Sequence, residues 1–386
     1  MNIGNEKMSC RQAGRLFFYS FFPLSVLLLP QLLAQTSGMD GFFALVGGSL
    51  AGYVFLRIAL WLTAHIQESY VNLLPHLFGR AVTGLVLVVY LLVALYGAAY
   101  GLELLCQVIR IYLIRDTPVW LVMGALSVLA VYGLGGGAEC RGRRCELLFW
   151  FVLVPLMLLI FLAVWNIEPD HWLPVARVSG RRLAQNSYLV FGCFMAAAYL
   201  PIYADAVNRR EGLCAALRRS YVTSVVLLIL LFLTLTGIYG APTVAVMDEA
   251  VLELTAMVKV PGGFLERQDA LLCGIWFAGM YLFVENALYA AVWSREKLGT
   301  RQMDHWFRAG GGLLMYVAAL VLYRYRNLDD TLGAVYLKFA VPVLLLTVVA
   351  AALLTAWREK QERRQKKDSG STGADEQPIR YGKERE

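Results

Sequence analysis

Two carboxylates lie inside stretches of the sequence that are otherwise apolar. Glu285 is near the centre of one such stretch, and Glu103 is in another, close to Tyr96 and Tyr100. A charge inside a bilayer is costly, so an acid within a membrane-spanning segment is a functional hypothesis by default. Each carboxylate could hold a substrate ammonium, relay a proton or form a structural ion pair. Arg110 is a candidate partner for Glu103.

The stretch Leu16–Met39 is the element that must position this chemistry. It reads LFFYSFFPLSVLLLPQLLAQTSGM without a charged side chain, so it is long enough to cross a bilayer. Pro23 and Pro30 each remove a backbone N–H, and the carbonyl groups that they free must find partners inside the protein. We expect an interrupted helix whose irregular centre lies near Pro23–Val26. A proline-kinked helix that binds nothing is the alternative.

A second apolar stretch has the same character. Residues Tyr188–Ala204 read YLVFGCFMAAAYLPIYA, with Gly192 in the first half and Pro201 in the second. The two stretches are the first and the sixth of the predicted spans. Interrupted spans in corresponding places indicate an inverted-repeat fold with a binding site between them. Two independently kinked helices are the alternative.

The composition indicates a polytopic membrane protein. Of the 386 residues, 59% are hydrophobic and 16% are charged, whereas soluble domains are about 45–50% apolar and about 25% charged. The seven cysteines have no C-x-x-C spacing and the four histidines are scattered, so we expect free thiols and no metal site. Nothing resembles a nucleophile triad or a phosphate-binding loop. The sequence therefore predicts neither an enzyme nor a cofactor.

Hydropathy predicts an all-α fold with about ten transmembrane helices. The expected spans are 14–36, 41–64, 80–113, 117–134, 146–166, 184–206, 216–239, 268–294, 306–324 and 332–357. They form one transmembrane domain over residues 1–357, and the polar residues 358–386 are expected to be a disordered basic tail. Between the spans, Glu249–Val258 has the periodicity of a helix lying on the membrane surface.

The placement of basic residues predicts the orientation. Most of the 35 Lys and Arg fall in the segments that share a side with both termini, which puts the N- and C-termini in the cytoplasm. The net charge of +7 then reflects topology and attraction to acidic membrane lipids. Nothing in the sequence indicates a nucleic-acid partner.

An Arg-rich segment follows the fourth predicted span. It reads GLGGGAECRGRRCE over Gly133–Glu146, and its simplest interpretation is a basic inner loop. The spacings of Glu139 and Arg143, and of Arg143 and Glu146, allow ion pairs on a helix face. By itself the segment identifies no chemistry.

Short motifs in a fixed order carry a resemblance to a known family. They are Pro30, Thr117-Pro118, the spacing Gly137, Glu139, Arg143 and Glu146 followed by Pro155, Leu173-Pro174 with Gly180, and the run from Phe264 with Glu266, Arg267 and Asp269, then Trp276. Each motif alone is weak. In this order, over residues 7 to about 350, they resemble a spore germination protein of the GerAB type, the integral-membrane B subunit of a germinant receptor.

The resemblance implies a fold, a ligand and partners. The family is similar to amino-acid permeases of the APC superfamily, which implies an APC/LeuT-like inverted repeat with broken helices 1 and 6. It also implies a small nutrient, often an amino acid, bound at mid-membrane. The implied partners are an A subunit and a C-subunit lipoprotein in the inner membrane of the spore.

Three positions depart from the family pattern. The family usually has glycine in the first helix break, where this chain has Pro23 and Ser25. Cys193 stands where an acid is often expected after Gly192, and Ala250 stands where proline is expected. These departures bear on which ligand binds, and on whether any ligand binds.

Three functions remain open. The first is a receptor subunit that senses a small nutrient, the second is a proton-coupled amino-acid or small-solute transporter that uses Glu285 or Glu103, and the third is a ligand-free scaffold or ion path of the same complex. The expected binding site lies between the two breaks and the third and eighth spans. Its residues are Phe22, Pro23, Ser25, Tyr96, Tyr100, Glu103, Gly192, Cys193, Phe194 and Glu285.

Overall fold

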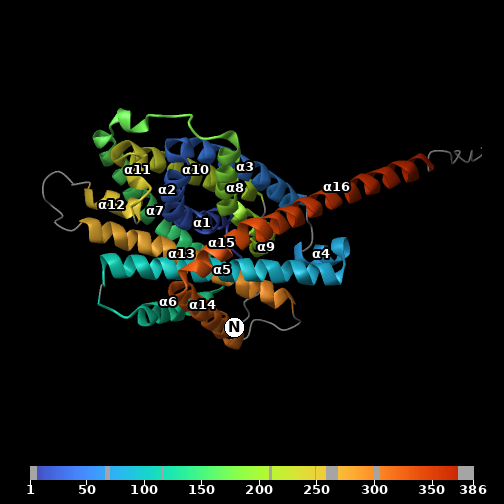
Figure 1. Ribbon diagram of the computed structural model, residues 1–386. Coiled ribbons are helices and arrows are strands. Elements are labelled where there is room, and N and C mark those ends of the chain that lie inside the picture. The colour runs from blue at the N-terminus through green and yellow to red at the C-terminus, as the bar shows by residue number, and fades with distance from the viewer. Residues whose placement is uncertain are drawn as a thin grey trace, which may run out of the picture.

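The computed structural model describes residues 7–65, 70–114, 116–207, 211–247, 249–257, 268–298 and 305–372. These residues form a helical bundle (Figure 1). The helices are α1 Cys10–Tyr19, α2 Phe22–Ser37, α3 Gly41–His65, α4 Tyr70–Phe78, α5 Arg80–Tyr112, α6 Val119–Leu134, α7 Gly137–Ala163, α8 Gly180–Cys193, α9 Leu200–Tyr203, α10 Leu213–Tyr239, α11 Ala241–Val244, α12 Ala250–Met257, α13 Gln268–Leu298, α14 His305–Arg324, α15 Arg326–Val335 and α16 Val341–Thr372.

The all-α polytopic fold is confirmed. Within the described ranges, six helical segments are long and apolar enough to cross a membrane, and α6 is a shorter apolar helix. Every predicted span coincides with a helix or with a pair of helices in series. Helices that are distant in sequence lie side by side: α1 with α7 and α10, α3 with α8, and α5 with α13 and α14. These contacts between distant helices join most of the bundle into one packed domain.

The first break lies earlier than expected. Helix α1 ends at Tyr19 and α2 begins at Phe22, so the interruption falls between them and not at Pro23–Val26. Proline is favoured in the first turn of a helix, because the N–H that it lacks would have no intrahelical acceptor there. Pro23 therefore starts α2 and does not interrupt it. Pro30 lies inside α2, which continues to Ser37.

The second break is confirmed near Gly192. Helix α8 ends at Cys193, a 3₁₀ segment runs over Phe194–Tyr199, and α9 follows. The hydroxyl of Tyr336 donates a hydrogen bond of 2.7 Å to the carbonyl oxygen of Gly192. A carbonyl at the end of α8 thereby gains a hydrogen-bond donor in place of the backbone N–H that the interrupted helix no longer supplies.

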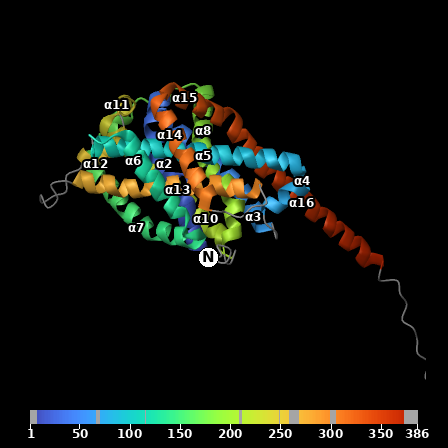
Figure 2. The ribbon, with the colours of Figure 1, turned by 90° about the horizontal axis from the view of Figure 1, so that it is seen from below.

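Three segments differ from the sequence-based expectations. Helix α7 begins at Gly137 rather than at residue 146, so the expected Arg-rich loop is helical; an acid in its first turn, Glu139, favours this start. The expected surface helix forms as α12, but its apolar residues are buried against α2, α10 and α13. Helix α16 continues to Thr372 and projects from the body in both views (Figures 1 and 2), while residues 373–386 lie outside the described residues.

A glycine contact holds α8 in place against α3. A Cβ atom at Gly48 would lie 2.4 Å from the carbonyl oxygen of Ser187 and 2.5 Å from the Cβ of Val190. These are backbone and branch-point atoms, which cannot move aside as the end of a long side chain can. The close approach of α3 therefore fixes the half of the sixth span that precedes the break.

The substitution Gly48→Ala should separate α3 from α8 and lower the free energy of unfolding by about 1–3 kcal/mol, as overpacking usually does. The thermal midpoint of the purified protein in detergent measures this. Gly84→Ala in α5 is the matched control, because no atom lies within 4 Å of its added methyl group. Equal midpoints for the two variants would contradict the proposed close packing.

Candidate ligand-binding site

A cavity of about 550 Å³ lies between the two helix breaks. Its walls come from the α1–α2 junction, α5, the α8 break, α13 and the segment that links α15 to α16. Pockets that bind small molecules usually measure about 300–1,000 Å³. The cavity therefore has the size and the position expected for a mid-membrane ligand site.

Five of the predicted site residues line this cavity. They are Ser25, Tyr96, Tyr100, Gly192 and Cys193. Their elements bring them together because both breaks face α5, where the Tyr96 and Tyr100 rings stack with centroids 5.9 Å apart. The Ser25 hydroxyl donates to the carbonyl oxygen of Phe21 at 2.8 Å, an acceptor that the Ser25 backbone N–H also uses at 3.0 Å.

Three other predicted residues belong to the packed core behind the cavity. Phe22 is fully buried and stacks against Trp276, with centroids 6.4 Å apart. Phe194 is buried edge-on against Phe21 at a centroid distance of 5.3 Å. Pro23 is buried in the first turn of α2. These side chains shape the breaks without facing the cavity.

Sequence reasoning missed several polar groups that line the cavity. They are Ser20, Gln31, Gln35, Tyr199, Tyr203, Asn286 and Tyr336. Asn286 gave the clearest signal, since it is an amide within an apolar span next to Glu285. Tyr336 begins a π-helical turn over Tyr336–Ala340, and such turns are frequent at functional sites.

The described residues that line the cavity offer hydrogen-bonding groups. Among the described residues that line it there is no Asp, Glu, Lys, Arg or His. Hydroxyl groups of serine and tyrosine and amides of glutamine and asparagine supply its polar surface. A ligand with an uncompensated charge would have no counter-ion there, so the site fits a neutral or zwitterionic molecule.

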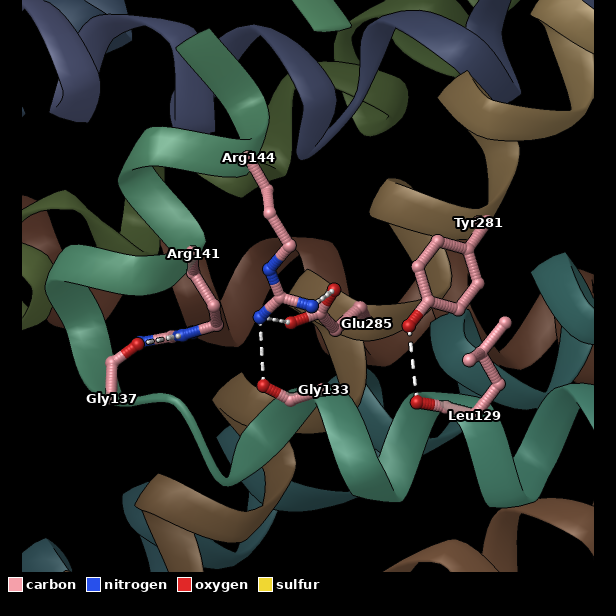
Figure 3. Close-up of polar contacts among 7 residues, drawn as sticks. All are labelled: Leu129, Gly133, Gly137, Arg141, Arg144, Tyr281 and Glu285. Carbon is pink, nitrogen blue, oxygen red and sulfur yellow. Dashed lines mark hydrogen bonds and ion pairs between the residues drawn. The ribbon is translucent and has the colours of Figure 1, made fainter. Parts of the chain in front are cut away.

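Glu285 lies outside the cavity, which corrects its predicted place in the ligand site. Its side chain is 1% exposed, and both carboxylate oxygens accept from Arg144, from Nη1 at 2.8 Å and from Nη2 at 2.6 Å (Figure 3). Arg144 Nη2 also donates to the carbonyl oxygen of Gly133 at 2.7 Å. The pair thus connects α13, α7 and the end of α6. A Cβ at Gly133 would lie 2.9 Å from the Glu285 carboxyl carbon, so glycine gives the pair its room.

Glu103 also lies outside the cavity. It is buried, and its carboxylate accepts a hydrogen bond from Gln107, one turn further along α5. Arg110 donates to the hydroxyl of Tyr323 at 2.9 Å, which ties α5 to α14. Glu103 is therefore a buried side chain held by its own helix and is not among the described residues that line the cavity.

The charged motif residues of α7 form ion pairs, one of them with a partner that the sequence did not predict. The predicted pair of Glu139 and Arg143 forms on the surface of α7. Glu146 pairs with Arg11 of α1 instead of with Arg143, because the bundle brings α1 alongside α7. Thr117 and Pro118 lead directly into α6, with Pro118 at its N-cap position. Glu266, Arg267 and the side chain of Asp269 lie outside the described residues.

Removing the acid of the buried pair should be costly, because it leaves the Arg144 charge without compensation. Glu285→Ala should lower the free energy of unfolding by about 3–5 kcal/mol. Arg143→Ala on α7 breaks an exposed pair and should cost about 0–1 kcal/mol. Thermal or denaturant unfolding in detergent compares the two variants. A similar small loss in both would show that Arg144 finds another partner.

Comparison with known proteins assigns the family. A family model described as spore germination protein matches residues 7–324. The spore germination protein GerLB of Bacillus cereus is 24% identical over 310 residues, which cover 76% of this chain and 81% of that protein. Spore germination protein KB of Bacillus subtilis (strain 168) is 23% identical over 385 residues, covering 93% of this chain and 97% of that protein.

Solved transporter structures share the fold. A Na⁺-coupled sialic acid symporter superposes with a TM-score of 0.65 at 12% identity, covering 90% of this chain and 80% of that one. Mhp1, a nucleobase-cation-symport-1 family transporter, superposes with a TM-score of 0.64 at 13% identity, covering 88% and 78%. Both have the LeuT fold. The chain is therefore an integral membrane protein that belongs to the spore germination protein family, of the GerAB type, and it has a permease-like fold.

Proposed function

We propose that this chain is the membrane subunit of a spore germinant receptor. It binds a small nutrient, an amino acid, in the cavity between the helix breaks and triggers germination together with an A subunit and a C-subunit lipoprotein. It acts without enzymatic chemistry in the inner membrane of the spore, with both termini in the cytoplasm. The observation that carries the proposal is a ligand-sized cavity at the interrupted helices of a spore germination family member.

The chemistry of the cavity is consistent with a zwitterionic amino acid. Its carboxylate would lie near the N-terminal amides of α2, where the helix dipole favours negative charge. Its ammonium would be met by hydroxyl and carbonyl oxygens, since the described part of the lining has no carboxylate. Binding passes a signal to the partners only through a difference in affinity between two conformations. The two broken helices are the elements most able to change conformation at the ligand.

Transport of a small solute is the second candidate, because the fold is shared with symporters. A transporter would move labelled solute across vesicles without partner subunits. A receptor would bind without net flux and would need the A and C subunits to act. Proton coupling through Glu285 or Glu103 has little structural support, since each carboxylate is hydrogen-bonded outside the cavity. A ligand-free scaffold would neither bind nor transport, and its loss would dissociate the complex.

Ligand binding should raise the thermal midpoint of the purified protein, because a ligand that binds only the folded state stabilises it by mass action. Screening single amino acids, sugars and nucleosides should give a shift with at least one amino acid. Ala287→Phe adds a ring at the cavity wall and should abolish that shift.

Val128→Phe is the matched control, since the Val128 side chain is 71% exposed on α6 and away from the cavity. This control should keep the full shift. A panel that stabilises neither the wild-type protein nor the complex with its A and C subunits would rule out nutrient binding. A shift that survives Ala287→Phe would place the binding site elsewhere.

A further inference from the structure

Arg141 is a buried cation whose terminal nitrogens have no hydrogen-bond partner among the described residues. It lies on α7, and its side chain is 1% exposed. Nε donates to the carbonyl oxygen of Gly137 at 3.3 Å, but neither Nη1 nor Nη2 forms a hydrogen bond. Figure 3 shows Arg141 beside Arg144 on the same helix, with its polar contact directed to Gly137 and not to Glu285.

The neighbourhood of Arg141 has more positive than negative charge. Arg144 and Glu285 neutralise one another through two hydrogen bonds, so the carboxylate is already engaged. Among the residues that the structure describes, Arg141 forms no ion pair. Among the described residues, the cluster of two guanidinium groups and one carboxylate therefore keeps one uncompensated positive charge.

The aromatic contact of Arg141 offsets only part of this charge. The guanidinium carbon lies 3.1 Å above the centroid of the Tyr289 ring, and a cation–π contact contributes far less than the cost of burying an ion. Water could accept from the free N–H groups but would leave the charge uncompensated. Buried charges are normally paired, and an unsatisfied one commonly marks a missing ion or water.

Arg141 lies behind the wall of the cavity. The Tyr289 ring on which it lies stacks with Tyr203, at a centroid distance of 6.3 Å, and Tyr203 lines the cavity wall. Asn286, the neighbour of Glu285 in sequence, lines the same cavity. An anion beside Arg141 would therefore be separated from the cavity by two tyrosine rings.

We propose that Arg141 is the binding residue of an anion site behind the cavity. The ligand is a small monovalent anion, either inorganic, such as chloride, or the carboxylate group of a small solute. It accepts hydrogen bonds from Nη1 and Nη2 and neutralises the excess charge beside the Arg144–Glu285 pair. The site does not depend on nutrient binding, so it can be present whether or not the proposed function is correct.

The test measures the thermal midpoint of the purified full-length chain at constant ionic strength. The reference buffer contains sodium gluconate, whose anion is too large for a buried site. In one arm sodium chloride replaces the gluconate salt stepwise, and in the other arm sodium acetate does. The midpoint of the wild-type protein should rise saturably in at least one arm. A rise with chloride alone identifies an inorganic anion, and a rise with acetate alone identifies a carboxylate. A rise in both arms identifies one site that accepts either anion.

Arg141→Gln should abolish the rise, and in gluconate it should be at least as stable as the wild-type protein because the uncompensated charge is gone. Arg143→Gln is the matched control; Arg143 is 70% exposed on the same helix and pairs with Glu139, and its variant should keep the full rise. Arg141→Lys keeps the charge but loses the forked donors, so it should need a higher anion concentration for half-saturation.

Several results would overturn the proposal. They are no saturable rise in either arm, an unchanged rise in Arg141→Gln, or the same half-saturation in Arg141→Lys as in the wild-type protein. If Arg141 only packed against Tyr289, the glutamine variant would be destabilised equally at every anion concentration. Gel filtration establishes that each variant is folded, and the lysine variant decides the question if the glutamine variant aggregates.

Discussion

A helix that is interrupted inside a bilayer must satisfy its freed backbone groups within the protein, because hydrocarbon offers no hydrogen bonds. The rest of this structure follows from that constraint. At the first break the backbone N–H of Ser20 donates to Phe17, and the Ser20 hydroxyl donates to the carbonyl oxygen of Leu16 in its place. The second break uses Tyr336, which donates to Gly192 from a distant span. Satisfying the two breaks brings polar groups from several spans around one cavity.

The two glutamates buried within the spans, Glu285 and Glu103, lie outside this cavity. Glu285 is held by Arg144 at the junction of α6, α7 and α13, and Glu103 is held within α5. The cavity itself offers hydroxyls and amides. A neutral or zwitterionic ligand could therefore bind or leave without breaking a buried ion pair. The ion pair would instead fix the helices behind the cavity.

The sequence was sufficient to predict the spans and both interruptions. The thickness of the bilayer sets the length of an apolar span, so the span can be recognised from the sequence alone. Proline and glycine change the backbone within a few residues of where they stand, so they mark an interruption locally. The exact place of the first break was wrong by one turn. Pro23 fits the first turn of a helix as well as a kink, and only packing distinguishes the two.

The predicted site residues and the lining of the cavity overlap only in part, for geometric reasons. Tyr96, Tyr100 and Glu103 share one face of α5, but Glu103 is about 10 Å further along the axis than Tyr96, beyond the end of the cavity. Glu285 and Asn286 are neighbours in sequence and diverge around the helix, so the amide lines the cavity and the carboxylate faces α7. The partner of Glu285 lies in a different helix, Arg144 of α7. No sequence spacing could identify that pair.

The most direct test of the central claim is equilibrium binding of tritiated amino acids to the purified chain, with and without Gly192→Leu. Gly192 lines the cavity, and a Cβ there would lie 2.8 Å from Leu337 Cδ2, so a leucine would occupy space at the second break. At least one amino acid should bind saturably to the wild-type protein, and none should bind to the folded variant. Equal binding by both proteins would show that the cavity is not the binding site.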